Sequence, residues 1–455
     1  MKSQLTSVIL VSRAKAVANG VGYRLSVRIA VLAVLVTLAG STHPAAAARA
    51  ADQTLVFRSA AITVAGFGVN QGEQVVPSPA VDGYVTGMSG DVVDADGNSV
   101  PVTSVMLHHT VFAKANAHDA TCSQVTDYDG NPWPLQVQRF YGLGEERAVL
   151  TLPPGYGYPN RGSDRWGLVY MLMNHKPATR TVYIQYTVHY ATGQTLTPVH
   201  PYWFDEHNCA ADPIFDVPGN RRMFSTFSKS VDYTMPESGR IVAAGGHLHG
   251  GGVRLDLTDQ TCGTKLLTSE PTWGLPVVRP IVHEPGPKHM TSLTAATGIP
   301  VSAGDRLRMT AVYDNSLPHT RVMGIMMVFL APGPVSKCEA VPPLPADPLS
   351  HPSAPPRMRL PLARTPAGPL RSVPGTSVGD FQYGAQRVVV KRGTRFVWRF
   401  TGPSRHDVTL ANGPVGFSSQ SRDSGSFSFR FTRPGVYRLF CSLHPTAMTQ
   451  IVTVR

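Results

Sequence analysis

The 455-residue chain is too long for one hydrophobic core, so two or three domains are expected. Its formal charge of +12 is uneven: residues 1–48 carry +5, residues 49–339 carry −4, and residues 340–455 carry +11 from 15 basic and 4 acidic side chains. Because the basic residues of the last part are spread along strand-like runs and a proline-rich segment, we expect docking on an acidic redox partner or on the core itself, and no binding of nucleic acid.

The N-terminal segment 1–48 has the pattern of a secretory signal peptide. Lys15, Arg24 and Arg28 precede the apolar stretch 29–40, and small residues follow at 45–48. The stretch is shorter than the ~20 residues that a membrane-spanning helix needs. We therefore expect a secreted, cell-envelope or periplasmic protein with no stable membrane span after signal removal; a single membrane anchor is the alternative.

The remainder of the chain has the patterning of β-strands. Every second residue of 182–188 is apolar, which places these side chains on one face of a strand and His189 on the other. Residues 305–313 and 322–330 are expected to form a strand pair joined by a loop. Frequent Gly and Pro residues between short strands favour β-sandwiches, so the predicted fold class is all-β.

Composition divides the chain into parts. Residues 340–376 are rich in proline and predict a semi-extended linker outside any core. A softer boundary lies between His200 and Pro218, and we expect β-sandwich domains at 49–200 and 201–339. A small third β-domain is expected at 377–455.

The five cysteines divide into one and four. Cys441 lies in a metal-ligand pattern, which leaves Cys122, Cys209, Cys262 and Cys338, an even number in an exported chain. Three pairings are possible. We favour Cys122–Cys209 and Cys262–Cys338, because each bond then stays roughly inside one domain. Each would contribute about 2–4 kcal/mol.

Four residues near the C-terminus suggest a copper site. A strand leads into Cys441, His444 and Met448 follow in the next loop, and His406 lies 35 residues before Cys441. A thiolate, two imidazoles and a weak thioether are the ligand set of a blue-copper electron-transfer site; a buried cysteine with incidental histidines is the alternative. The pattern resembles cupredoxins of the plastocyanin and amicyanin type over about 378–455, although its His-x3-Met gap is like that of azurin. The resemblance implies a Greek-key sandwich with one type 1 copper.

Six further residues are weak signals alone but occur in a suggestive order: His108, His109, His189, His247, His249 and Met323. His247 and His249 sit at i and i+2 in a strand flanked by glycine, so both face one side and can share an ion. Adjacent strand residues such as His108 and His109 face opposite sides, so sharing an ion requires a twisted or terminal position. Met323 alone would usually be core packing.

This order resembles the copper type II, ascorbate-dependent monooxygenases, the family of peptidylglycine α-hydroxylating monooxygenase and dopamine β-monooxygenase, over about residues 55–340. The resemblance implies two jelly-roll-like β-sandwiches, each holding one type 2 copper. It implies an electron-donating copper on His108, His109 and His189. It implies an oxygen-activating, catalytic copper on His247, His249 and Met323.

The expected chemistry is hydroxylation of a small organic substrate. Inserting one atom of O₂ into a C–H bond, with water as second product, consumes two electrons, which two one-electron coppers can supply. A thioether favours Cu(I), the state that meets O₂. Ascorbate or another reductant would provide the electrons, and the blue-copper domain would act as a relay.

Three positions depart from the peptide-amidating members of this family. Those enzymes hold the substrate carboxylate with an Arg where this chain has Gly245, and use Asn and Tyr where it has Ile325 and Met327. We therefore expect an apolar pocket, and a substrate other than a glycine-extended peptide.

Two other functions compete. A multicopper oxidase or nitrite reductase would need several His-x-His motifs and a His-Cys-His, but the chain has one His-x-His and lacks the latter. A non-catalytic, secreted copper-binding or electron-transfer protein could keep all six core ligands, so the sequence leaves this alternative open.

Overall fold

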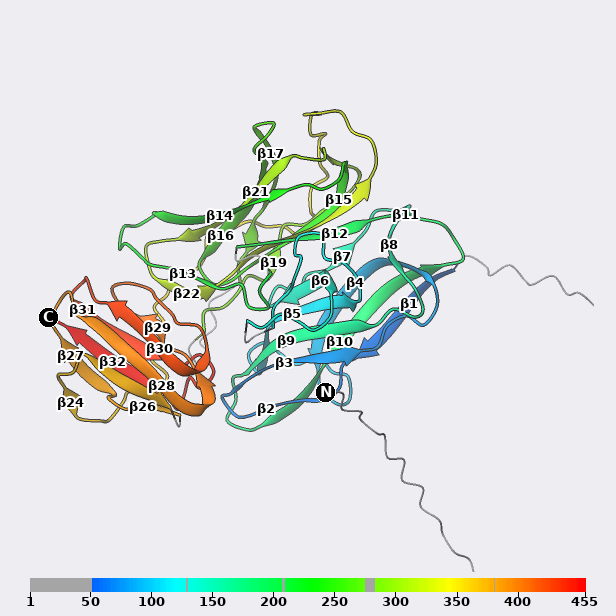
Figure 1. Cartoon of the computed structure of the whole chain (residues 1–455). Coiled ribbons are helices and arrows are strands. Elements are labelled where there is room, and N and C mark those ends of the chain that lie inside the picture. The colour runs from blue at the N-terminus through cyan, green and yellow to red at the C-terminus, as the bar shows by residue number, and fades with distance from the viewer. Residues whose placement is uncertain (1–50, 128–129, 207–208, 275–282, 380) are drawn as a thin grey trace, which may run out of the picture. The chain divides into compact units, whose positions relative to one another are not determined.

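The computed structural model describes residues 51–127, 130–206, 209–274, 283–379 and 381–455, and the predicted signal peptide lies outside these ranges. All regular elements in the described ranges are β-strands (Figure 1), which confirms the predicted all-β class. The described residues belong to one compact unit. Within them, no helix has the length and apolar character that crossing a membrane requires.

The first sandwich contains eleven strands: β1 (Ala51–Arg58), β2 (Ile62–Val64), β3 (Val69–Val76), β4 (Gly83–Val93), β5 (Val105–Ala115), β6 (Val137–Gly144), β7 (Leu150–Thr151), β8 (Tyr156–Asn160), β9 (Trp166–Asn174), β10 (Arg180–Thr192) and β11 (Thr197–Pro198). One sheet has the order β1-β10-β4-β8-β11, with β2 beside β10 and β7 beside β4. The other has the order β3-β9-β5-β6.

The alternation predicted for residues 182–188 is present in β10. Val182, Ile184, Tyr186 and Val188 are buried in the sandwich core, and the intervening residues are more exposed. Tyr186 packs edge-on against Phe112 of the facing sheet, with ring centroids 4.8 Å apart. Full burial of each such side chain contributes about 1.5–3 kcal/mol, which holds the two sheets together.

The second sandwich contains twelve strands: β12 (His200–Asp205), β13 (Phe215–Val217), β14 (Thr226–Thr234), β15 (Gly239–Leu248), β16 (Gly252–Asp259), β17 (Thr264–Ser269), β18 (Pro271–Thr272), β19 (His289–Met290), β20 (Leu293–Val301), β21 (Arg306–Asp314), β22 (His319–Val322) and β23 (Gly324–Pro332). Its sheets have the orders β12-β23-β15-β20 and β14-β21-β16-β17, and β13-β22 and β18-β19 form two-stranded ribbons.

The strand pair expected from residues 305–313 and 322–330 is not formed. The two segments are strands, β21 and β23, but they lie in different sheets. The reason is the short strand β22 between them, which pairs with β13 and carries the chain from one sheet towards the other. This transition places Met323 at the break between β22 and β23.

The third group of strands forms a smaller Greek-key sandwich: β24 (Leu370–Arg371), β25 (Gly375–Gly379), β26 (Gln382–Tyr383), β27 (Arg387–Val390), β28 (Arg395–His406), β29 (Thr409–Asn412), β30 (Arg422–Arg430), β31 (Gly435–Phe440) and β32 (Thr449–Val454). Its sheets have the orders β24-β27-β32-β31-β29 and β26-β25-β28-β30. Trp398, Phe396 and Tyr437 are fully buried between them. The site of Cys441 belongs to this core.

The proline-rich segment carries no strand between Pro332 and Leu370 but is attached to the second sandwich. The Asp347 carboxylate lies 2.7 Å from His289 Nε2 and accepts a hydrogen bond from Ser292 N at 2.8 Å. Leu360 is buried against residues of the third sandwich. These contacts attach the segment to the second and third sandwiches.

Both favoured disulfides are present. Cys122 is bonded to Cys209 and Cys262 to Cys338. Cys441 remains a buried thiol. Two disulfides accord with an oxidising compartment.

Candidate metal centres

The C-terminal site is assembled from two neighbouring loops. His406 ends β28, Cys441 follows β31, and His444 lies in the loop before β32. The Nδ1 atoms of the two histidines are 3.2 Å apart, and Cys441 Sγ is 3.6 Å from His444 Nδ1. Met448 is fully buried in the same core as Cys441, and its carbonyl accepts a hydrogen bond from Cys441 N. The ligand atoms of His406, Cys441 and His444 are therefore brought within 4.8 Å of one another, and Met448 packs in the same core.

Without a bound cation, the surroundings of Cys441 favour the protonated thiol. Burial, with the nearby Asp407 carboxylate, raises the pKa of the Cys441 thiol. Burial and the neighbouring His406 lower the pKa of His444 to about 4, so this imidazole is neutral at pH 7. Asp407 N lies 3.4 Å from the sulfur and is oriented to donate to it. A bound cation would stabilise the thiolate that burial alone disfavours.

A second cluster of acidic and sulfur atoms carries no comparable chemistry. Among the described residues, Asp259, Cys262 and Asp305 also place ligand atoms within 4.8 Å of one another. Cys262 is bonded to Cys338, so it offers no thiolate. Asp305 forms an ion pair with Lys337, which already neutralises its charge.

In the core, β5 supplies His108 and His109 from adjacent positions. The register of β5 against β9 shifts between Leu107 and His109, so His108 sits on a bulge. A bulge re-aims a side chain that would otherwise face away from its neighbour. The two Nδ1 atoms lie 3.0 Å apart, and both side chains are buried.

The end of β15 supplies the second pair. His247 Nε2 and His249 Nε2 lie 3.0 Å apart, as expected for residues two apart that face one side. The His249 ring also lies edge-on against His108, with ring centroids 4.4 Å apart. The pairs from the two sandwiches therefore meet in one place.

A fifth imidazole, His283, joins this group. Its ring centroid lies 4.9 Å from that of His108, and its Nε2 lies 3.3 Å from Glu145 Oε1. Sequence analysis missed His283 because it stands in an irregular segment with no ligand spacing around it. Only its position in space assigns it to the cluster.

Two of the five imidazoles contact a carboxylate through one ring nitrogen. Glu146 contacts His247 Nδ1 at 3.0 and 3.1 Å, and Glu145 contacts His283 Nε2. Metal-binding histidines characteristically donate their second ring N–H to such a group, which orients the ligating nitrogen. His247 thus presents Nε2 towards His249.

The buried imidazoles of the cluster are held neutral. Burial, then the neighbouring histidines, hold the pKa values of His108 and His249 well below the usual range. Burial and the nearby His247 lower the pKa of His109 to about 3. Neutral imidazole is the form that binds metals, so these groups are available as ligands at pH 7.

His189 lies elsewhere, contrary to the ligand set that the family resemblance implies. It is exposed on β10, and its Nδ1 lies 3.5 Å from Thr54 Oγ1 of β1. β10 belongs to the sheet opposite that of β5. Since Val188 and Tyr190 on either side are buried, His189 projects outwards, and the structure does not bring it to His108 and His109.

Met323 is held next to the His247–His249 pair through Tyr313. The Tyr313 hydroxyl accepts a hydrogen bond from His249 N at 3.0 Å and donates one to Met323 O at 2.5 Å. Tyr313 and Met323 are both buried. Met323, His247 and His109 line one pocket, so the thioether shares a space with imidazoles from both sandwiches.

The walls of this pocket are largely apolar. They include Trp133, Trp203, Ile325 and Met327, and Gly245 also lines the pocket. A Cβ placed on Gly245 would meet no atom within 4 Å. Gly245, which stands where the peptide-amidating enzymes have an Arg, therefore opens into the pocket.

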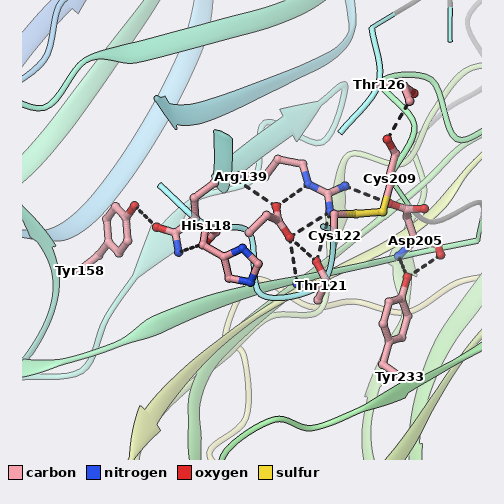
Figure 2. A network of polar contacts seen from close by, with 11 residues as sticks. His118, Thr121, Cys122, Thr126, Arg139, Tyr158, Asp205, Cys209 and Tyr233 are labelled. Atoms are coloured by element: carbon pink, nitrogen blue, oxygen red, sulfur yellow. Dashed lines mark hydrogen bonds and ion pairs between the residues drawn. A yellow bond between two sulfur atoms is a disulfide. The ribbon is translucent and has the colours of Figure 1, made fainter. Parts of the chain in front are cut away.

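Among the described residues, Arg139 is the one guanidinium that lines the pocket, and its charge is already paired. Arg139 Nε donates to Asp119 at 2.8 Å, and Nη1 donates to Asp205 at 3.0 Å. Figure 2 shows the Arg139 guanidinium next to the disulfide of Cys122 and Cys209. Because Arg139, Asp119 and Asp205 are buried, these two ion pairs hold the sandwiches together, and Arg139 does not offer its charge to a ligand.

Contacts around Arg321 join the core cluster to the C-terminal site. Arg321 Nη1 donates to Ser419 O at 3.3 Å, and Nη2 donates to Asp212 at 3.0 Å. One cavity is lined by His108, His249 and His283 and also by Phe440 and Ser442, the two neighbours of Cys441. The two candidate centres therefore border the same space.

Comparisons with known proteins give partial likenesses. No family model matches the chain, and no curated protein matches it. A reduced Cu(I) form of a proline-to-glycine mutant of amicyanin is 22% identical to this chain, with a TM-score of 0.17. The match covers 18% of this chain and 80% of the amicyanin chain. A purple cupredoxin from Nitrosopumilus maritimus is 27% identical to this chain, with a TM-score of 0.15. The match covers 16% of this chain and 81% of the cupredoxin chain.

Proposed function

We propose that the protein is an exported copper-dependent monooxygenase that hydroxylates a C–H bond of an apolar organic molecule, with its C-terminal thiolate site as electron relay. One observation carries the proposal. His109, His247 and Met323, three of the expected ligands, line a single apolar pocket between the sandwiches. Metal ions held by these groups would face whatever molecule enters the pocket.

The donor atoms suit copper. Neutral imidazoles bind copper in both oxidation states, and thioether and thiolate ligands favour Cu(I). When bound, copper supplies one-electron redox chemistry and reactivity towards O₂. In the overall reaction, R–H and O₂ with two electrons and two protons give R–OH and water. Ascorbate or another one-electron donor would provide the electrons.

The chain's own residues hold the ligands in position. Glu146 accepts a hydrogen bond from His247 Nδ1 and so directs Nε2 inwards. Tyr313 ties the backbone of His249 to that of Met323. A Cβ on Gly144 would lie 2.5 Å from Cε1 of His247, so glycine is needed there for the ring to pack.

The pocket favours a substrate without a charged anchor. Its aromatic and aliphatic walls would desolvate an apolar molecule, and ligand pockets of this kind rely on few polar contacts. Arg139 is neutralised by Asp119 and Asp205, so a substrate carboxylate would be buried without a partner. Apolar substrates are therefore proposed over peptides with a free C-terminus.

The contacts around Arg321 support the relay. They connect a residue two positions before Met323 with Ser419 of the third sandwich. Thr320 Oγ1 also donates to Leu410 O at 2.8 Å, and Asp216 accepts a hydrogen bond from Ser418 N at 2.7 Å. These direct hydrogen bonds give the domain that carries Cys441 a defined attachment beside the core cluster.

The test is substrate-coupled oxygen consumption. Copper-loaded protein with ascorbate and ¹⁸O₂ would be incubated with apolar aromatic and aliphatic compounds, and products analysed by mass spectrometry. We expect one ¹⁸O atom per hydroxylated product, and loss of product in Met323→Ala with retention in His189→Ala. Efficient amidation of a glycine-extended peptide would contradict the proposed substrate class. Bound copper without coupled oxygen consumption on any compound would instead indicate an electron carrier.

A further inference from the structure

We propose that His283 is a metal ligand, and that the five core imidazoles hold two copper ions in one shared centre between the sandwiches. The five are His108, His109, His247, His249 and His283. The identity of the metal rests on the proposed function; the grouping of the ligands rests on the geometry alone.

Each sandwich contributes one pair of nitrogens that can chelate an ion. The Nδ1 atoms of His108 and His109 are 3.0 Å apart, and so are the Nε2 atoms of His247 and His249. Two imidazole nitrogens at this separation can both reach one ion at ordinary ligand distances. Two pairs therefore provide for two ions.

The pairs are too close to form independent sites. His108 has ring contacts with His109, His249 and His283, at centroid distances of 5.2, 4.4 and 4.9 Å. A small cavity is bounded jointly by His108, His247, His249 and His283. Ions bound to the two pairs would thus share one enclosure, with His283 at its edge.

Contacts with neighbouring residues hold His283 in an orientation suited to binding an ion. Glu145 contacts His283 Nε2 and also accepts a hydrogen bond from Gly286 N at 3.1 Å. The adjacent Glu284 forms an ion pair of 2.7 Å with the buried His319. With Nε2 directed at a carboxylate, the Nδ1 atom of His283 remains to bind an ion.

The same arrangement predicts that His189 is dispensable for copper binding. An ion on His108 and His109 needs a further donor, and His189 projects from the outer face of another sheet. His283 lies beside His108 and carries the supporting carboxylate. The third donor to this pair therefore comes from the second sandwich.

The experiment compares His283→Ala with the matched variant His189→Ala in the full chain. Copper per chain is measured by mass spectrometry after loading and dialysis, and the blue absorption of the Cys441 site reports folding of each variant. We expect three coppers in the wild type and in His189→Ala. We expect two in His283→Ala, or an affinity for one copper lowered about tenfold or more. His283→Gln serves as a second, polar variant and should behave in the same way.

Electron paramagnetic resonance of the oxidised protein adds a second readout. We expect the signal of the two core coppers to be broadened, or its integrated intensity to be lower than two Cu(II) ions would give. In His283→Ala, the one remaining core copper should give the full intensity of a single Cu(II) ion. Any of three results would overturn the inference. His283→Ala could retain three coppers, His189→Ala could lose a copper, or the wild type could give two unbroadened core signals of full intensity. A wild type that binds blue copper alone would overturn the proposed function as well. A coupled core without turnover would contradict only the proposed function.

Discussion

The two candidate metal centres are built in opposite ways. The C-terminal site takes His406, Cys441, His444 and Met448 from 43 residues of one small sandwich. The core cluster takes its imidazoles from β5, from β15 and the residue that follows it, and from an irregular segment before β19, which belong to two sandwiches. A site within one small domain is recognisable from spacing, whereas a site between domains depends on how they pack. The predictions below test that difference.

The largest expected effect is confined to the C-terminal site. Cys441→Ser removes the thiolate, so we expect complete loss of the blue absorption and of one copper per chain. The core coppers should remain, because no core ligand contributes to this site. Absorption spectra and copper analysis check both points; loss of all copper would show that the centres are not separable.

A smaller effect is expected from Glu146→Gln in the core. The carboxylate holds His247 Nδ1, and removing such a group typically weakens metal binding about 10–100-fold. Competition with a Cu(I) chelator would measure the change. Glu237→Gln is the matched control, because Glu237 contacts the exposed His200 outside both centres. Equal copper affinity in the two variants would contradict the role given to Glu146.

Tyr313→Phe tests whether packing between strands positions the core ligands. The change leaves His249 N and Met323 O without their partner, at a cost of about 1–3 kcal/mol in unfolding free energy. Core copper affinity should fall as well. Tyr437→Phe removes a hydroxyl that bonds to Arg433 O in the third sandwich, and should lower stability without altering the core copper.

The smallest effect concerns pH and Glu206 in the second sandwich. Burial raises the pKa of Glu206 to about 8, although Ala311 N donates to its carboxylate. The folded state therefore favours the protonated acid, and its contribution to stability is lost as pH rises from about 4.5 to about 8. Glu206→Gln should melt at a higher temperature than the wild type at pH 9 and at a similar temperature at pH 4. Parallel melting curves across pH would refute this assignment.

His189 shows how local patterning and family resemblance can disagree. The alternation of residues 182–188 predicts that His189 points away from the core, and β10 has this arrangement. The order of motifs nevertheless implied a place for His189 among the copper ligands. The structure follows the local pattern, because turning His189 inwards would expose Val188 and Tyr190.

The sequence by itself predicted the all-β class, the favoured pairing of the disulfides, the alternation of β10 and the grouping of His406, Cys441 and His444. These features depend on residue type and short spacing, which strand geometry converts directly into position. Only the tertiary structure decided that β21 and β23 lie in different sheets, that Arg139 is neutralised, and that His283 joins the core imidazoles. Each of these depends on contacts between distant segments. No local period encodes such contacts, because burial and packing between sandwiches select them.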